Sequence, residues 1–255
     1  MNTSKKVALV TGSATGIGRA IALAFARAGY DLAINYSRSE KDIRVTEQLA
    51  REAGAQVAVI KCDVSQEAEV EQMMKAVEEA YGGRLDVLLN NAGTTIDTPP
   101  KEFDTVKVED FDRVFAVNVR GTFLVTKHAT RLLRAMPSAD IINTASIVGL
   151  RPGPQPLPYS ASKAAIISMT RTLAGALGPK VRVNAIAPGW MEGDWMERAL
   201  GDNYERLMDR RAKATPMQRC ATAEDVAETA LAIATSMRFV NGQVIVIDGG
   251  YSSIT

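Results

Sequence analysis

Residues 11–18 read Thr11-Gly12-Ser13-Ala14-Thr15-Gly16-Ile17-Gly18. They lie between an apolar run, Lys6–Val10, that predicts a buried strand and a helical pattern from about Ile17 to Ala28. Glycine reaches positive φ without strain and lets phosphate oxygens approach the backbone, while the free N–H groups of the following helix face an anion. In this position the turn predicts a dinucleotide-binding βα unit. A tight turn that binds nothing is the alternative.

Short β-branched runs alternate with helical patterns along the rest of the chain, which is typical of βαβ units. We therefore predict an α/β fold, a Rossmann-type, doubly wound sheet of seven parallel strands with helices on both faces. The expected strands are Lys6–Val10, Asp31–Tyr36, Gln56–Lys61, Leu85–Leu89, Asp140–Thr144, Val181–Ile186 and Gln243–Ile247. The expected helices are Ile17–Ala28, a polar helix ending at Ala53, Gln66–Tyr81 capped by Ser65, Val108–Ala135, Ser160–Leu177 and Glu224–Thr235.

No change in composition divides residues 1–255, so we expect a single dinucleotide-binding and catalytic domain. The segment from about residue 188 to 222 lacks strand signals but is rich in Met, Trp and helical pattern, which predicts a mobile substrate cap. Large apolar side chains there favour a bulky or lipophilic substrate. A small core internal to the cap explains them equally well. These side chains are Trp190, Met191, Trp195 and Met196.

The composition excludes several classes of function. Thirty basic and 29 acidic residues leave a net charge of +1, which provides no field for nucleic acid. Cys62 and Cys220 are far apart, without a CxxC, which predicts reduced thiols in a cytoplasmic protein. The whole sequence has one histidine and two cysteines, too few for a conventional zinc site, so we expect no metal site. No apolar run is long enough for a signal core or a membrane span, so we expect no membrane association.

The end of the second expected strand bears on which dinucleotide binds. An acidic side chain there would bind the adenosine ribose and repel a 2′-phosphate, but the sequence reads Asn35-Tyr36-Ser37-Arg38. Arg38 and the Ser37 hydroxyl are suited to a phosphate instead. This favours NADP(H) over NAD(H), although Arg38 is also acceptable as an ordinary loop residue.

Four polar residues form a candidate catalytic set. Tyr159 and Lys163 lie four apart, so on a helix they share one face. An ammonium near a phenol lowers the pKa of the phenol and makes it a usable proton donor near neutral pH. Ser146, after the fifth strand, is placed to hold a substrate carbonyl, and Asn118 is a polar residue that helix formation does not require. Each residue alone also has an ordinary structural explanation.

These motifs in this order resemble the classical short-chain dehydrogenase/reductase family. The matching elements are Thr11–Gly18, Asn90-Asn91-Ala92-Gly93, Asn118, Ser146, Tyr159-xxx-Lys163, Pro188-Gly189 and the ending Val240-Asn241-Gly242-Gln243…Asp248-Gly249-Gly250. They extend from about residue 6 to 250. Within the family the chain is most similar to the 3-oxoacyl-[acyl-carrier-protein] reductases and the neighbouring sugar and ketone reductases.

The resemblance implies a role for each matching residue. Tyr159 is the acid in reduction and the base in oxidation, Lys163 lowers its pKa and contacts the nicotinamide ribose, Ser146 steadies the reacting oxygen, and Asn118 holds a water that links Lys163 to solvent. The implied cofactor contacts are Gly12, Ser13, Thr15, Gly16, Ile17 and Gly18 at the pyrophosphate and adenosine, Asp63 and Val64 at the adenine, Asn91, Ala92 and Gly93 under the ribose, and Pro188 and Gly189 beside the nicotinamide.

The sequence also departs from the family. A threonine that binds the nicotinamide carboxamide is often found after Pro-Gly, but here the stretch is Trp190-Met191-Glu192-Gly193-Asp194-Trp195. The resemblance further implies a homotetramer built on the helices Val108–Ala135 and Ser160–Leu177 and the last strand. Arg131 and Lys180 are candidate contacts for an acyl carrier protein. A basic group on the cap predicts only a solvated helix face: Arg206, Arg210, Arg211 and Lys213.

Three functional hypotheses remain open at this stage. The leading one is an NADPH-dependent carbonyl reductase that transfers a hydride between nicotinamide and a ketone or alcohol, with a 3-oxoacyl thioester or a bulky ketone as candidate substrate. The second keeps the fold but is an NAD-dependent alcohol or sugar dehydrogenase. The third is a non-catalytic NADP-binding sensor, which would not need an intact proton donor.

Overall fold

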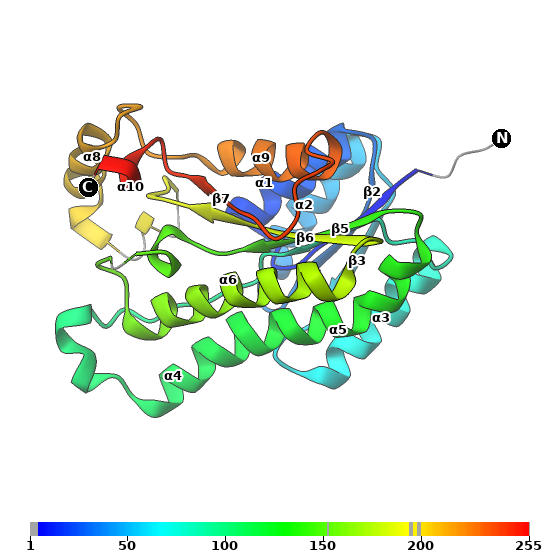
Figure 1. The fold of residues 1–255 in the computed structure, drawn as a ribbon, viewed down its shortest axis with the longest axis horizontal. Coiled ribbons are helices and arrows are strands. Elements are labelled where there is room, and N and C mark those ends of the chain that lie inside the picture. The colour runs from blue at the N-terminus through cyan, green and yellow to red at the C-terminus, as the bar shows by residue number, and fades with distance from the viewer. Residues whose placement is uncertain (1–4, 152, 194–195, 198–199, 255) are drawn as a thin grey trace.

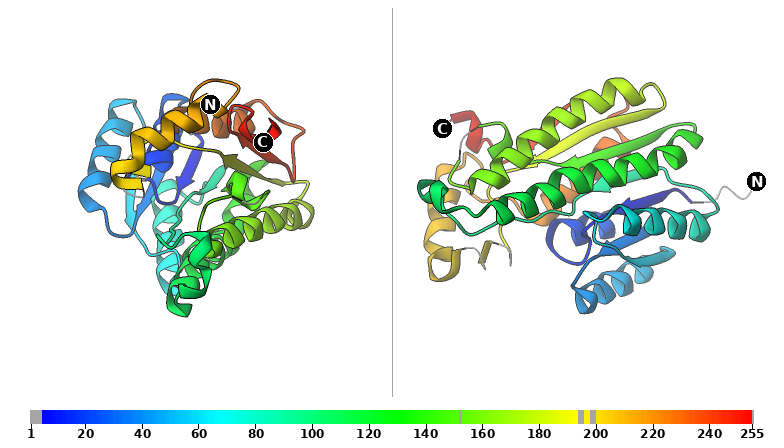
Figure 2. Two further views of the ribbon diagram at one scale, coloured as in Figure 1. Left: turned by 90° about the vertical axis from the view of Figure 1, so that its left-hand side faces the viewer. Right: turned by 90° about the horizontal axis from the view of Figure 1, so that it is seen from below.

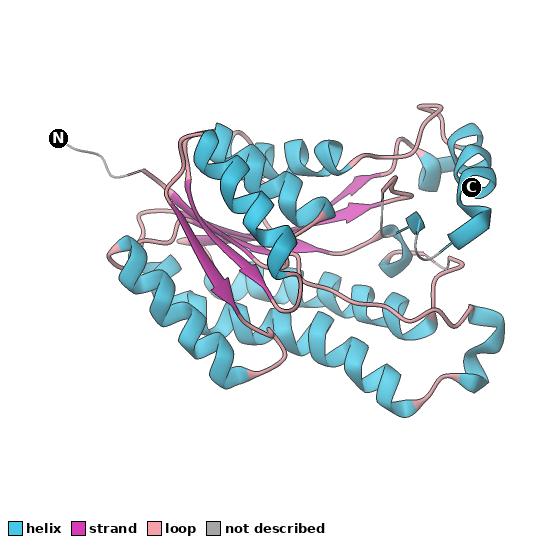
Figure 3. Cartoon of the chain, turned by 180° about the vertical axis from the view of Figure 1, so that it is seen from behind, coloured by secondary structure: helices cyan, strands magenta, loops and turns pink. Residues whose placement is uncertain are grey.

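The computed structural model describes residues 5–151, 153–193, 196–197 and 200–254. Within these residues seven strands form one sheet in the order β3-β2-β1-β4-β5-β6-β7, and all neighbouring pairs are parallel. Figure 3 shows the sheet enclosed between helices. The predicted fold is therefore confirmed. The strands are β1 (Val7–Val10), β2 (Asp31–Tyr36), β3 (Val57–Lys61), β4 (Val87–Asn90), β5 (Ala139–Thr144), β6 (Val181–Pro188) and β7 (Val244–Ile247).

Helices connect the strands and cover both faces of the sheet (Figure 1). The α-helices are α1 (Gly16–Arg27), α2 (Glu40–Glu52), α3 (Glu67–Tyr81), α4 (Val108–Phe115), α5 (Thr122–Ala135), α6 (Leu157–Leu177), α8 (Tyr204–Ala214), α9 (Ala223–Thr235) and α10 (Tyr251–Ile254). The described residues also include the 3₁₀ turns η1 (Pro100–Thr105), η3 (Ile147–Gly149) and η4 (Gly201–Asn203) and a π-helical turn, η2 (Ala116–Gly121).

The core is divided into two layers by the sheet itself. Along β1, Ala8 and Val10 belong to the cluster that packs α1, α2 and α9, whereas Val7 and Leu9 belong to the cluster that packs α3, α5 and α6. Successive side chains of a strand point to opposite faces, and both faces are buried here, so the strand is apolar throughout. This explains why short apolar runs were sufficient to predict the strands.

Two helices differ in detail from the prediction. The expected helix Val108–Ala135 is continuous, but a π-helical turn separates α4 from α5, and it runs alongside α6 (Figure 2, right). Helix α6 begins at Leu157, three residues earlier than expected, because Pro158 lies in its first turn, where the missing N–H of proline costs nothing. Tyr159 is thereby placed inside the helix.

The segment from 188 to 222 carries η4 and α8, which lie beyond the carboxyl ends of the strands. It is tied back to the sheet by a parallel bridge between Met191 and Ala221. None of the helices in the described part of the chain combines the length and apolar character that a bilayer span requires.

Candidate active site

A cleft of about 790 Å³ lies at the carboxyl edge of the sheet, where the strand order reverses between β1 and β4. Ligands of open α/β sheets bind at such a switch point. One wall is the glycine-rich turn after β1, and the opposite wall holds Ser146, Tyr159 and Lys163. The cleft thus unites the two motifs that the sequence analysis singled out separately.

The glycines of the turn are required by close backbone contacts. Gly12 has φ +62°, and a Cβ on it would lie 2.8 Å from the Cα of Ala92. A Cβ on Gly18 would lie 2.1 Å from the carbonyl oxygen of Gly12. Helix α1 begins at Gly16 without a side-chain cap from Thr15, so its first N–H groups remain available to an anion. This cradle fits the diphosphate of a dinucleotide.

Thr11 and Asn91 hold the turn against the loop after β4. The Thr11 hydroxyl accepts hydrogen bonds from the backbone N–H of Asn91 at 3.0 Å and of Ala92 at 3.1 Å. The Asn91 amide nitrogen donates to the carbonyl oxygens of Thr11 and Gly12, at 3.1 and 3.0 Å. Asn91 was among the predicted contacts, but this role of Thr11 was not predicted; its position directly before Gly12 was the available signal.

Ser13 points away from the cleft. Its side chain is buried, and its hydroxyl accepts a hydrogen bond from the Asn35 N–H of β2 at 3.0 Å. The Asn35 side chain accepts from the Gly12 N–H at 3.1 Å. Both side chains therefore connect the turn to β2. Ser13 is absent from the cleft wall as described, so the expected contact between Ser13 and a cofactor has no counterpart in this geometry.

Ser37 and Arg38 are exposed between β2 and α2, outside the described lining of the cleft. The turn is connected to this region by Arg19, which the sequence analysis missed. The Arg19 guanidinium donates to the carbonyl oxygens of Ala14 and Asp42 at 2.6 and 3.1 Å, and its Nε donates to the Thr46 hydroxyl at 3.0 Å. The signal was a basic residue directly after the last glycine of the motif.

Asp63 and Val64 follow β3 and also lie outside the described cleft lining. Asp63 accepts hydrogen bonds from the backbone N–H and the hydroxyl of Ser65, at 2.9 and 2.8 Å. The prediction that Ser65 caps the following helix is wrong, because this hydroxyl is bonded to Asp63 and α3 begins at Glu67 after Gln66. Val64 is buried and packs against Gly121: a Cβ added to Gly121 would lie 2.7 Å from the Cγ2 atom of Val64.

The three reactive side chains meet at the far wall of the cleft. Tyr159 and Lys163 lie one turn apart on α6, and the Lys163 Nζ is 5.5 Å from the centre of the Tyr159 ring. The hydroxyl groups of Ser146 and Tyr159 are hydrogen-bonded to each other. Lys163 is buried and donates to the carbonyl oxygen of Thr144 at 2.7 Å. The predicted grouping of Ser146, Tyr159 and Lys163 is present.

A glycine that the sequence analysis overlooked makes this grouping feasible. A Cβ on Gly149, at the end of η3, would lie 2.7 Å from the backbone carbonyl carbon of Lys163. The turn that carries Ser146 therefore rests directly on the backbone of α6. Gly149 stands three residues after Ser146 in the sequence, which was the only signal for its role.

Burial dominates the pKa values of both titratable groups. It raises the pKa of Tyr159 to about 12, although the hydrogen bond from Ser146 acts to lower it. Burial also lowers the pKa of Lys163 to about 8, because the interior disfavours the ammonium. From the sequence, Lys163 was expected to lower the pKa of Tyr159. In this structure the direction is opposite, since desolvation outweighs the hydrogen bond.

Asn118 lies in the π-helical turn η2 and is buried. Its side chain accepts from the Thr94 N–H at 2.8 Å and donates to the Thr94 carbonyl oxygen at 3.0 Å and the Ser162 hydroxyl at 2.9 Å. A Cβ on Gly93 would lie 3.5 Å from Asn118 Oδ1 and 3.7 Å from Lys163 Nζ, so all three groups are neighbours. π-Helical turns are frequent at functional sites.

The cap has a small apolar core of its own. Trp190, Met196, Met208 and Cys220 are buried together, and Trp190 and Met196 also line the cleft with Met191. Trp195 lies outside the described residues. The prediction that Arg211 lies on a solvated helix face is wrong. Its guanidinium lies 3.4 Å from the centre of the Trp190 ring, and burial lowers its pKa.

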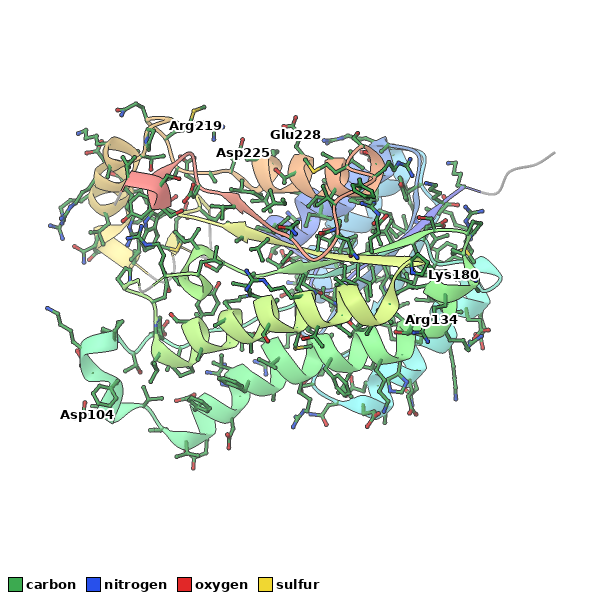
Figure 4. All side chains as sticks on the ribbon, in the orientation of Figure 1. Asp104, Arg134, Lys180, Arg219, Asp225 and Glu228 are labelled. Atoms are coloured by element: carbon green, nitrogen blue, oxygen red, sulfur yellow. The ribbon has the colours of Figure 1, made fainter. Side chains whose placement is uncertain are left out.

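Two surface groups lie away from the cleft. Lys180 immediately precedes β6, and Arg131 in the last turns of α5 pairs with Glu78. Figure 4 shows Lys180 beside Arg134, at the end of the molecule opposite the cap. The expected contact of Arg131 and Lys180 with an acyl carrier protein stays a prediction.

A cluster of possible metal ligands lies on the surface. Glu67, Glu71 and His128 bring ligand atoms within 4.8 Å of one another, but the Lys127 Nζ lies 2.6 Å from the Glu67 carboxylate and already pairs with its charge.

Comparison with known proteins agrees with this geometry. The family model described as Enoyl-(Acyl carrier protein) reductase matches residues 12–252. A 3-oxoacyl-[acyl-carrier-protein] reductase of Synechocystis is 36% identical to the chain, over 96% of either protein. The chain belongs to the short-chain dehydrogenase/reductase family. It is an oxidoreductase that acts on carbonyl or alcohol groups with a nicotinamide cofactor, and the resemblance to 3-oxoacyl-[acyl-carrier-protein] reductases is confirmed.

Two solved structures of this short-chain dehydrogenase/reductase family differ in their cofactor. An actinorhodin polyketide ketoreductase with NADPH superposes with a TM-score of 0.89 at 31% identity, over 97% of either chain. An NAD⁺-bound xylitol dehydrogenase superposes with a TM-score of 0.90 at 31% identity, over 98% of this chain and all of the other. Fold similarity of this degree is thus compatible with either dinucleotide.

Proposed function

We propose that the protein is an NADPH-dependent carbonyl reductase that interconverts a ketone and an alcohol. The observation that carries the proposal is the hydrogen bond between the hydroxyls of Ser146 and Tyr159, with Lys163 buried one helical turn away. A proton donor and a second hydroxyl thus converge on one wall of the cleft. A protein that only senses a nucleotide has no need of this pair.

The lining of the cleft supports a position for the diphosphate and for the nicotinamide half of the cofactor. The diphosphate would lie against Gly12, Gly16 and Gly18, where a Cβ at two of the positions would collide with backbone atoms. Asn91, Ala92 and Gly93 would lie under the ribose, and Pro188 and Gly189 beside the nicotinamide. When bound, the dinucleotide supplies the hydride that is transferred to or from the substrate carbon.

Residues of the chain itself would transfer the proton to and from the substrate oxygen. Tyr159 would donate its phenolic proton to the substrate oxygen in reduction and remove it in oxidation. Ser146 would hold the same oxygen through its hydroxyl. The charge of Lys163 would stabilise the phenolate that forms, and a water held near Asn118 would return a proton from solvent.

The preference for NADPH is argued from the end of β2. Ser37 and Arg38 are exposed there, and no acidic side chain occupies residues 35–38. Arg38 would pair with a 2′-phosphate. In an Arg38→Asp variant the ratio of the dissociation constants for NADPH and NADH should therefore reverse. Arg44→Asp, on the following helix α2, where Arg44 pairs with Glu40 and Glu47, should leave the ratio unchanged. A wild type that prefers NADH would contradict this assignment.

The substrate is proposed to be a bulky ketone or a 3-oxoacyl thioester. Trp190, Met191 and Met196 place apolar surface on the cap side of the cleft, and we propose that residues 188–222 close over the substrate within a single domain. A screen with NADPH should begin with free 3-oxoacyl thioesters, because Lys180, one of the candidate carrier-protein contacts, lies at the end of the molecule opposite the cap (Figure 4).

We also propose a cytoplasmic homotetramer. Phe111 and Phe123 on the α4–α5 helix and Val246 on the edge strand β7 are exposed apolar side chains, which is typical of interaction surfaces. Both cysteines are buried and free. Light scattering on the purified protein tests the assembly.

Substitution of Tyr159 by Phe tests the proposed reaction. The phenylalanine retains the ring but lacks the proton, so turnover should fall by at least about a hundredfold while the dissociation constant for NADPH stays within about twofold. Tyr36→Phe serves as a control, because Tyr36 is buried between β2 and the α2 layer. A Tyr159→Phe enzyme with full activity would overturn the mechanism.

A further inference from the structure

Residues 189–193 form the wall of the cleft that continues from β6. The Gly189 N–H donates to the carbonyl oxygen of Ile247 at 2.9 Å, and the Glu192 N–H donates to that of Ala221 at 3.0 Å. The next N–H, that of Gly193, departs from this backbone pairing and donates to the phenolic oxygen of Tyr204 at 3.2 Å. A side chain of the cap helix therefore reaches into this wall.

Tyr204 is built into the cap. It is the first residue of α8, its ring packs against the buried cluster around Trp190 and Met208, and it lines the cleft together with Gly193. Residues 190–195 have no side-chain hydroxyl of their own. The Tyr204 phenol thus supplies a hydroxyl to a stretch of the wall that lacks one.

The phenolic proton of Tyr204 has no acceptor among the described residues. Its oxygen accepts from Gly193, and a phenol both accepts and donates. Two other hydroxyls of the cleft are already hydrogen-bonded: that of Tyr159 to Ser146, and that of Thr222 to the Asp225 carboxylate at 3.1 Å. An oriented donor therefore faces the part of the cleft beyond Gly189.

We propose that Tyr204 binds the carboxamide oxygen of the nicotinamide, an inference that rests on the proposed function. A dinucleotide extending from the glycine turn to Tyr159 brings its nicotinamide past Gly189. The carboxamide is the hydrogen-bonding group of that ring, and its oxygen requires a donor. Because Tyr204 begins α8, this bond would also link the bound cofactor to the cap helix.

Calorimetric titration of three ligands tests the proposal. The ligands are NADP⁺, its thionicotinamide analogue, whose sulfur is a weaker acceptor, and 2′-phospho-ADP-ribose, which lacks the ring. Tyr204→Phe should weaken NADP⁺ binding by about three- to tenfold, weaken the thionicotinamide analogue less, and leave the ring-free ligand unchanged. Tyr251→Phe removes a hydroxyl from the same apolar cluster outside the cleft lining and should change none of the three.

Other results overturn the inference. Equal loss for all three ligands assigns Tyr204 a structural role, and unchanged NADP⁺ binding with a raised KM for substrate assigns the phenol to the substrate. If wild type binds NADP⁺ but Tyr204→Phe binds all three ligands as tightly, only this inference fails. If wild type binds neither NADP⁺ nor NAD⁺, the proposed function fails with it.

Discussion

The glycine-rich turn and the cap lie on opposite sides of one cleft and are built in opposite ways. In the turn, backbone lies on backbone: Gly12 contacts Ala92, and Gly18 contacts Gly12 itself. In the cap, side chains make the contacts, with Arg211 stacked on Trp190 and Tyr204 bonded to Gly193. The turn has no room for a Cβ at positions 12 and 18, whereas the contacts of the cap are made by side chains.

This difference separates cofactor binding from substrate selection. A backbone cradle binds the part of the ligand common to every reaction, since a diphosphate does not vary. A cap held by side chains can adapt to different substrates. Substitutions in the turn should therefore affect cofactor binding and stability together, whereas substitutions in the cap, apart from those at Tyr204, should affect the substrate.

Gly18→Ala should have the largest effect. The new Cβ would lie 2.1 Å from the Gly12 oxygen and 2.6 Å from the Asn91 amide nitrogen, so backbone must move. We expect the free energy of unfolding to fall by more than about 3 kcal/mol, measured by urea denaturation, together with loss of cofactor binding. Gly175→Ala, with open space around the Cβ on helix α6, is the control and should be neutral or slightly stabilising. A stable Gly18→Ala protein that binds cofactor would refute the distinction.

The buried Lys163 should make stability depend on pH. Its pKa is about 8 in the folded protein, against 10.5 as the ordinary value, so the unfolded chain binds more protons between these pH values. The free energy of unfolding should therefore rise with pH, by about 2 kcal/mol from about pH 7 to 9.5. Above about pH 10 the raised pKa of Tyr159 acts in the reverse sense.

Two lysine variants separate this effect from general titration. In Lys163→Met the rise should vanish, while Lys127→Met, which removes an exposed lysine paired with Glu67, should keep it. Urea denaturation at several pH values provides the measurement. An identical slope in wild type and Lys163→Met would show that Lys163 does not titrate in this range.

Arg211→Ala should have the smallest effect, confined to the cap. Loss of the stack on Trp190 removes about 1 kcal/mol of cation–π interaction. Amide hydrogen exchange in α8 should become about fivefold faster, and the KM for substrate should rise with the dissociation constant for NADPH unchanged. Arg210→Ala, at the exposed neighbouring position, is the control. Weaker NADPH binding in Arg211→Ala would mean that the stack on Trp190 also positions Tyr204 toward the cofactor.

Much of the fold could be predicted because its strands are buried on both faces. The seven strands were found within a few residues of their observed bounds, since each is a short apolar run between turn signals. The errors concern the starts of helices, where more than one residue can serve as the cap or first residue. Ser65 was a plausible cap but is bonded to Asp63, and α6 begins at Leu157, before the predicted Ser160, with Pro158 in its first turn.

The reactive residues of the candidate site could be predicted, but the residues that hold them in place could not. Tyr159 and Lys163 are four residues apart, so their proximity follows from helical periodicity. Three residues that hold the site were missed because each contacts a segment distant in sequence. Arg19 bonds to α2, Gly149 packs on the backbone of α6, and Thr11 bonds to the loop after β4. Sequence spacing carries no information about such contacts.

The sequence by itself determined the parallel sheet, the glycine turn and the pairing of Tyr159 with Lys163, because periodicity and glycine's conformational freedom are local properties. The tertiary structure alone decided the rest. It buried Lys163 and Tyr159 enough to move both pKa values, directed Ser13 into β2, and brought Arg211 onto Trp190 and Tyr204 onto Gly193. Desolvation and contacts between distant segments depend on how the whole chain packs, and no local pattern encodes them.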